Sequence, residues 1–160
     1  MKLAIGFSTA NLPLAKLIQD VEKRPYSHVF VVIPDPITQR PLVAQASHGM
    51  VHLCSYEGFE AVNKIVKTYE YEIDYPTYKK VWNQILDWLG AAYSIKQLIG
   101  LLVQKIFQLP TIPSWATNGC NAQICSEFGA RVASLIGIQI NKDFDDITPS
   151  NLDAILGAQK

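Results

Sequence analysis

A cysteine near the start of a predicted helix is the residue of this sequence best suited to covalent chemistry. Cys125 stands third in the sequence QICSE, after a loop that contains Pro, Asn and Gly. The positive end of a helix dipole and its unpaired N–H groups lower the pKa of a thiol and can hold an oxyanion. The position therefore favours a thiolate nucleophile. The simpler interpretation is a buried cysteine that acts as a small hydrophobic residue, which is the more frequent case.

A histidine at the start of a predicted strand is the candidate base for this thiol. His28 stands in the sequence YSHVF among largely apolar neighbours, and such a base needs a partner for its second ring nitrogen. If the hairpin pairs symmetrically about its loop, Phe30 lies opposite Gln45, and Gln45 shares the face of His28 and can orient the imidazole. A slip of one residue would move Gln45 to the other face. The simpler interpretation is a solvated histidine at a strand end.

Other histidines and cysteines leave two alternatives open. A zinc site would draw on five residues: His48, His52, Cys54, Cys120 and Cys125. Their spacings lack the two matching halves of a usual zinc site, so we expect no bound metal. Cys120 and Cys125 could instead form a redox disulfide, which a reducing compartment disfavours.

Strands that could position these residues lie mostly in the first half of the chain. Five segments are rich in β-branched or alternating apolar residues, which is typical of strands: 2–7, 27–33, 42–46, 50–53 and 64–73. They predict an antiparallel sheet of four to six strands.

Helical periodicity predominates after Pro76. Predicted helices cover five segments: 13–23, 76–90, 94–108, 121 or 123 to 135, and 151–156. A loop with Trp115, Asn118 and Gly119 precedes the helix of Cys125. Strands followed by helices that pack on them indicate an α+β fold, and we expect one domain over residues 1–160.

The composition narrows the classes of function. The 160 residues are 49% hydrophobic and 18% charged, which is enough apolar material for a core. Fourteen basic residues balance fourteen acidic ones, so no overall charge attracts nucleic acid. Three cysteines fit a reducing compartment, and neither a secretory signal nor a membrane-spanning segment is predicted. We expect a cytoplasmic protein, with release by lysis or in a virion left open.

Short motifs occur along the chain in a characteristic order: FST at 7–9, YSHV at 26–29, VAQA at 43–46, GAAY at 90–93, CSEF at 125–128 and ITP at 147–149. Over nearly the whole chain they resemble the circularly permuted NlpC-type papain-like cysteine peptidases of the YiiX-like branch. In that family the strand with the histidine precedes the helix with the cysteine. The resemblance implies a permuted papain-like fold, a Cys125 nucleophile, a His28 base and a third polar residue at the position of Gln45.

The sequence departs from this family at Gln45, where YiiX-like members usually carry Glu. A neutral amide can accept a hydrogen bond from the imidazole, but it stabilises the imidazolium less than a carboxylate does. The departure therefore bears on the strength of the activity. Tyr26 and Ser126 are further candidates for oxyanion or substrate binding, although an aromatic packed on the sheet is the more typical role for Tyr26.

Together these features predict a cysteine-dependent hydrolase of a peptide-type amide, for example in peptidoglycan peptides, acting through a thioacyl intermediate without metal or organic cofactor. Two alternatives stay open. The apolar segment 95–109 could receive the acyl chain of a lipid, as a thiol acyltransferase or esterase would require. Gln45 in place of Glu is also compatible with a non-catalytic binding or structural module that keeps the fold.

Overall fold

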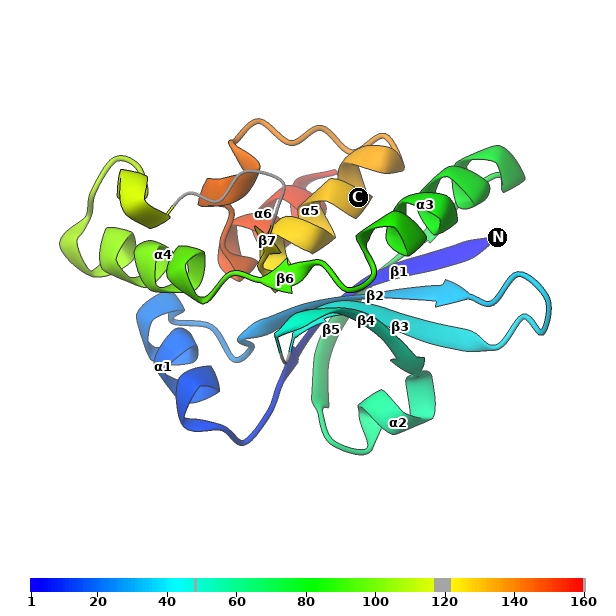
Figure 1. The fold of residues 1–160 in the computed structure, drawn as a ribbon, viewed down its shortest axis with the longest axis horizontal. Coiled ribbons are helices and arrows are strands. Elements are labelled where there is room, and N and C mark those ends of the chain that lie inside the picture. The colour runs from blue at the N-terminus through cyan, green and yellow to red at the C-terminus, as the bar shows by residue number, and fades with distance from the viewer. Residues whose placement is uncertain (48, 117–121, 160) are drawn as a thin grey trace.

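The fold is built on an open sheet of seven strands in the order β5-β1-β2-β3-β4-β6-β7 (Figure 1). The computed structural model describes residues 1–47, 49–116 and 122–159. Each strand pairs antiparallel with its neighbours except β6 and β7, which are parallel. The strands are β1 (Lys2–Thr9), β2 (His28–Pro34), β3 (Pro41–Ser47), β4 (Met50–Ser55), β5 (Lys64–Glu72), β6 (Ala92–Tyr93) and β7 (Ala122–Gln123).

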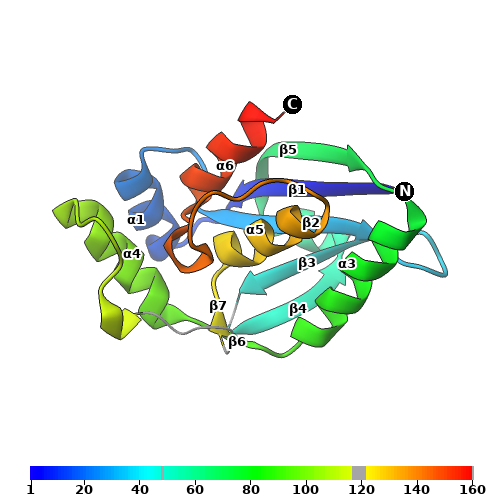
Figure 2. The same cartoon turned by 90° about the horizontal axis from the view of Figure 1, so that it is seen from above.

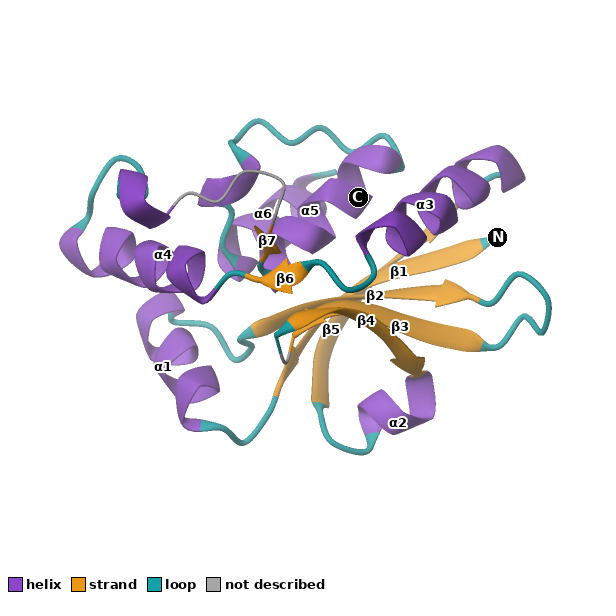
Figure 3. Cartoon of the chain, viewed as in Figure 1, coloured by secondary structure: helices purple, strands orange, loops and turns teal. Residues whose placement is uncertain are grey.

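Helices cover both faces of this sheet. They are α1 (Pro13–Glu22), α2 (Tyr56–Glu60), α3 (Tyr75–Trp88), α4 (Ile95–Phe107), α5 (Cys125–Leu135) and α6 (Pro149–Ala158). Helices α3, α5 and α6 lie over one face and α2 lies over the other, whereas α1 and α4 sit together at one end (Figure 3). In the part of the chain that the structure describes, no helix is long and apolar enough to cross a membrane.

The predicted α+β class is confirmed. Strands β1 to β6 form the antiparallel part of the sheet, within the four to six strands expected, and β7 adds a parallel pairing that the sequence did not predict. Helix α2 was also missed. It is a short helix with Ser55 as its N-cap residue. The hydroxyl of Ser55 accepts a hydrogen bond from the backbone N–H of Gly58. Of the predicted loop, Trp115 lies in a 3-10 turn (Ser114–Ala116), and Asn118 and Gly119 lie outside the described residues.

The register of the β2–β3 hairpin is the symmetric one. Val31 pairs with Ala44 and Pro34 with Pro41, and continuing this register places Phe30 opposite Gln45. The expected register is therefore confirmed, and His28 and Gln45 point to the same face of the sheet.

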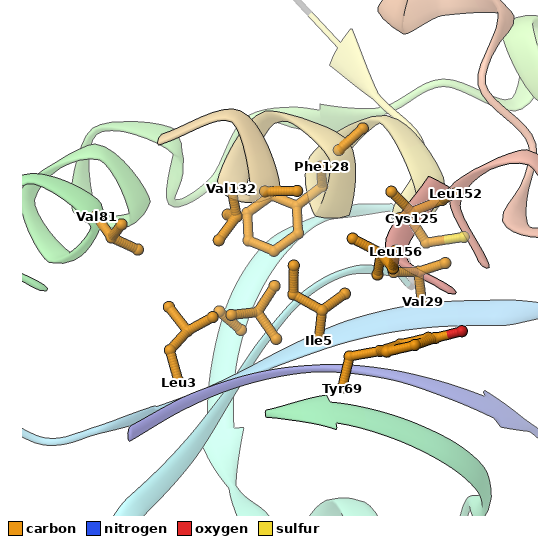
Figure 4. Packing of buried hydrophobic residues seen from close by; sticks show 14 of the residues in the cluster. Leu3, Ile5, Val29, Tyr69, Val81, Cys125, Phe128, Val132, Leu152 and Leu156 are labelled. Carbon is orange, nitrogen blue, oxygen red and sulfur yellow. The ribbon is translucent and has the colours of Figure 1, made fainter. Parts of the chain in front are cut away.

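The main core lies between the sheet and helices α3, α5 and α6 (Figure 4). Alternate residues of β1 and β2 point into it, since Ile5 and Val29 are fully buried there together with Phe128 of α5. A second cluster joins α1, α4 and the start of α5: Ile18, Leu98, Leu101, Ile112, Ala116 and Ile124. A small third cluster under α2 consists of Phe30, Val43 and Phe59.

Candidate functional site

Cys125 is the first residue of α5 and so lies in its first turn, as expected, although the helix begins later than the predicted start at 121 or 123. Ile124 precedes it in extended conformation as the N-cap residue. Helix α5 packs on β2, and the backbone N–H groups of Val29, Cys125 and Ser126 lie near enough to the Cys125 sulfur to favour its charged form. The sulfur thus lies where the helix begins and next to the strand that carries His28 (Figure 4).

The environment of Cys125 raises the pKa of its thiol to about 11, because burial in the core disfavours the charged form. The three backbone N–H groups act in the opposite direction, but burial outweighs them. The residue is 4% exposed. The helix terminus therefore lowers the pKa as expected, but the net change in the pKa is upward because burial has the larger effect. The thiol carries its proton at neutral pH, so a thiolate would have to be formed by a base at the moment of attack.

His28 contacts the residue predicted to orient it. Its Nε2 lies 2.7 Å from Oε1 of Gln45. Since an amide oxygen only accepts hydrogen bonds, Nε2 carries a proton and donates it. In the neutral imidazole the other nitrogen, Nδ1, then holds the lone pair, and Nδ1 is the atom that could take a proton.

The amide of Gln45 is itself fixed by two residues of β4. Its Nε2 lies 3.2 Å from Nε2 of His52 and 3.7 Å from the sulfur of Cys54. His52 in turn has Nδ1 3.4 Å from the carbonyl oxygen of Met50. This role of His52 was missed at the sequence level, where it was considered only as a zinc ligand. The pairing of Gln45 with His52 follows from a tight β3–β4 turn, which the spacing of Ser47 and Met50 could have indicated.

A cavity of about 270 Å³ brings the predicted residues together. Cys125, His28 and Gln45 all line it. It lies at the end of the sheet, since the pairing of β2 with β3 begins at Val31 and Ala44 and does not include His28 or Gln45. His28 and Val29 alternate in direction along β2, so the imidazole and the thiol approach the cavity from opposite faces of the sheet. The remaining polar lining residues are Ser27, Ser47, Asn63 and Tyr93.

Helix α1 and the residues just before it form an apolar side of this cavity. The apolar lining residues from this segment are Ala10, Leu12, Leu14, Ala15 and Ile18. Segment 95–109, expected at the sequence level to receive an acyl chain, contributes no described lining residue. An apolar group bound in the cavity would therefore contact α1.

Tyr93 is a further cavity residue that was not singled out from the sequence. Burial raises the pKa of the Tyr93 phenol, and the negative charge of a Cys125 thiolate would raise it further. The hydroxyl therefore stays protonated and can donate a hydrogen bond. Its position beside Cys125 depends on the β6–β7 pairing of Tyr93 with Gln123, and two-residue strands leave no recognisable pattern in the sequence.

Tyr26 and Ser126 are not among the described residues that line the cavity. The hydroxyl of Tyr26 donates to Oδ2 of Asp153 at 2.7 Å, and its ring packs 4.9 Å from that of Phe7. The hydroxyl of Ser126 donates to the carbonyl oxygen of Ile147 at 2.6 Å. Both side chains form hydrogen bonds within the core, so their hydroxyls do not face the described lining of the cavity. Of the two residues, Ser126 reaches the sulfur through its backbone N–H.

The residues considered for zinc are only partly described. Within the described ranges, no three histidine, cysteine or acidic side chains are placed to hold a metal ion. His52 and Cys54 contact Gln45 instead. His48 and Cys120 lie outside the described residues. The alternative of a Cys120–Cys125 disulfide therefore also falls outside them.

Comparison of the chain with models of known protein families and with curated proteins found no match.

Proposed function

We propose that the protein is a cysteine-dependent hydrolase that cleaves a peptide-type amide, built on a permuted papain-like fold of the NlpC type. One observation carries the proposal: Cys125, His28 and Gln45 line one cavity, and the contact of His28 Nε2 with Gln45 Oε1 leaves Nδ1 as the basic nitrogen. A nucleophile, a base and an orienting group are the parts that covalent acyl transfer requires.

The first half of the reaction acylates the enzyme. His28 Nδ1 takes the thiol proton as the Cys125 sulfur bonds to the substrate carbonyl carbon, which forms a tetrahedral oxyanion. Candidate donors for that oxyanion among the described residues are the backbone N–H groups of Cys125 and Ser126 and the phenol of Tyr93. The imidazolium then protonates the leaving nitrogen, the C–N bond breaks and a thioester remains.

The second half regenerates the thiol. His28 takes a proton from water as the water oxygen attacks the thioester carbonyl. The C–S bond then breaks, the carboxylic acid leaves, and the sulfur regains its proton from the imidazolium. Gln45 fixes the tautomer of His28 through its contact with Nε2, and its own amide contacts His52 and Cys54.

A second candidate function has its own supporting observation. The side of the cavity formed by Leu12, Leu14 and Ile18 is apolar, and such a lining suits the acyl chain of a lipid ester better than a charged peptide. A thiol esterase or acyltransferase would use the same Cys125 and His28 with an ester oxygen as leaving group.

Turnover of two substrate classes separates these functions. Peptide amides, including muropeptides, and short-chain lipid esters would be incubated with wild-type protein and with Cys125→Ser and His28→Ala variants. We expect amide cleavage by the wild type and at least about 100-fold less by either variant. Turnover of lipid esters alone would replace the first function by the second. Turnover of neither class, with an unreactive Cys125, would favour a non-catalytic binding module.

A further inference from the structure

Helix α4 carries two apolar faces, and only one of them is covered. Leu98 and Leu101 are buried in the second cluster. On another side of the helix, Ile95, Ile99 and Ile106 follow one another at spacings of four and seven residues and are 63%, 47% and 58% exposed. Residues at these spacings share one stripe of a helix. The exposed stripe contributes nothing to the described core.

Neighbouring segments carry further exposed apolar residues. Helices α1 and α4 contact each other and lie at the same end of the molecule in both views (Figures 1 and 2). In α1 and its N-cap residue, Leu12, Leu14 and Leu17 are about half exposed. Phe107, the last residue of α4, is 70% exposed, and Trp115 just beyond it is 55% exposed. We call these exposed residues, with those of the α4 stripe, the α1–α4 surface.

The segment that contains α4 carries a positive charge although the chain as a whole is neutral. Residues 88 to 126 include Lys96 and Lys105 but no acidic residue. Where α1 and α4 end, Lys23, Lys105 and Lys142 line a hollow of about 680 Å³.

Acidic groups offset part of this charge, since Glu22 pairs with Lys105 and the carboxylate of Asp146 accepts a hydrogen bond from the backbone N–H of Ile112, whereas Lys96 is exposed. The carboxylate of Glu22 in the hollow is buried and accepts hydrogen bonds from the hydroxyls of Thr148 and Ser150. Lys105 also lies 3.5 Å from it. Asp20 is the exposed acid on α1.

We propose that the α1–α4 surface docks on an anionic lipid bilayer. Exposed Ile, Leu, Phe and Trp side chains flanked by lysines are the combination that binds the interface of such a membrane, with apolar side chains entering the boundary of head groups and acyl chains. Lysines near an anionic surface add an electrostatic contribution. Because Leu12 and Leu14 also line the cavity of Cys125, docking would bring that cavity to the membrane.

Vesicle co-sedimentation tests the docking directly. Full-length protein would be mixed with vesicles of phosphatidylcholine alone or with added phosphatidylglycerol. We expect binding to the anionic vesicles, weakened by salt, and a loss of about tenfold in partitioning for the double variant Ile106→Ser with Phe107→Ser. Lys96→Gln should lower partitioning about fivefold on anionic vesicles alone.

Two controls isolate the surface from other effects. Ile37→Ser changes an apolar residue that is 89% exposed in the β2–β3 turn, at the opposite end of the molecule, and should bind as the wild type does (Figure 1). Cys125→Ser should also bind fully, so failure of docking and failure of catalysis are distinguishable.

Three results would overturn the proposal. The first is no binding to anionic vesicles, and the second is binding that the Ile106 and Phe107 substitutions leave unchanged. The third is a concentration-dependent dimer in light scattering that the same substitutions abolish, because a second copy of the chain would then cover the surface.

Discussion

The Cys125 thiol is subject to two opposing influences, burial and three directed N–H groups, and burial prevails. A pKa of about 11 instead of the ordinary 9.0 leaves about 100-fold less thiolate at neutral pH. Such a thiol reacts slowly with simple alkylating agents. It becomes a nucleophile when a bound carbonyl allows the proton to pass to His28. This distinguishes the site from a preformed thiolate–imidazolium pair.

The pH dependence of alkylation follows from this pKa. In the folded protein, iodoacetamide should modify Cys125 about tenfold faster for each pH unit gained from neutral to mildly alkaline conditions, with no plateau before about pH 11. In urea-unfolded protein the rate should level off nearer pH 9. Mass spectrometry of the Cys125 peptide gives the rates. A plateau already present at neutral pH in the folded protein would show a stable thiolate instead.

Gln45 should matter through the orientation of His28. Gln45→Ala removes the acceptor at 2.7 Å from Nε2, so the imidazole loses its fixed tautomer and kcat/KM should fall by about 100-fold. Gln45→Glu restores an acceptor with a negative charge and should equal or exceed the wild type. An unchanged rate in Gln45→Ala, measured with equal thermal stability, would remove Gln45 from the mechanism.

At the scale of single residues, the sequence was most informative where local geometry decides. The symmetric hairpin predicted the contact of His28 with Gln45 because strand register is set by a turn and a period of two residues. The pKa of Cys125 could not be predicted in the same way. Its sign depends on how deeply α5 sinks into the core, which is a property of long-range packing.

The close packing of α5 on β2 depends on Gly129. A Cβ added to Gly129 would lie 2.5 Å from Cγ1 of Val29 and 3.0 Å from Cδ2 of Leu152. Gly129→Ala should therefore destabilise the fold by about 1 to 3 kcal/mol, although alanine normally favours a helix. The substitution should also lower activity, because a displaced α5 would carry Cys125 away from β2. Thermal unfolding and kcat/KM measure both effects, with Ser134→Ala on the exposed side of α5 as control. A Gly129→Ala protein as stable and active as the control would contradict this packing.

Helix α6 is tied to the sheet by Asp153. Its carboxylate accepts from Tyr26 and Tyr69 at 2.7 Å each and pairs with Lys67 at 2.7 Å. Burial alone would raise the pKa of Asp153, but these three partners outweigh it and lower the pKa below 3.8. The stabilisation is therefore present above about pH 4 and is lost as the pH falls through the folded-state pKa.

Asp153→Asn should lower the free energy of unfolding by about 1 to 3 kcal/mol at neutral pH. The difference from the wild type should shrink as the pH falls below about 4, since protonation removes the same charge. Urea unfolding at several pH values measures it. Asp20→Asn, at an exposed acid of α1, should change little. A difference that does not vary with pH would mean that the charge of Asp153 contributes nothing.

At the scale of elements, the long helices and strands were predictable from periodicity, and their neighbours in space were less so. The segments that became β1 and β5 were both identified, but their pairing, with Lys2 opposite Glu72, joins residues far apart in sequence and leaves no local signal. Helix α2 and the strands β6 and β7 were missed because each is too short to show a period.

At the scale of the whole molecule, the candidate site lies between the main core and the second hydrophobic cluster. The main core contains Cys125 and Ala46, and the second cluster contains Ile18 and Ile124. Residues of both line the cavity. The end of the sheet, the start of α5 and the side of α1 thus meet at one place. This arrangement explains how residues 28, 45 and 125 come to line one cavity. Hairpin register indicated that residues 28 and 45 are neighbours, whereas only the resemblance of short motifs placed residue 125 beside them.

Mass-spectrometric trapping of an acyl group on Cys125 is the most direct test of the central claim. Protein would be treated with an activated acyl probe small enough for the cavity, quenched in acid and mapped by peptides. We expect a thioester on Cys125 in the wild type, little on Cys54, and about 100-fold slower formation in His28→Ala. Equal, slow acylation of Cys54 and Cys125, unaffected by His28→Ala, would contradict it.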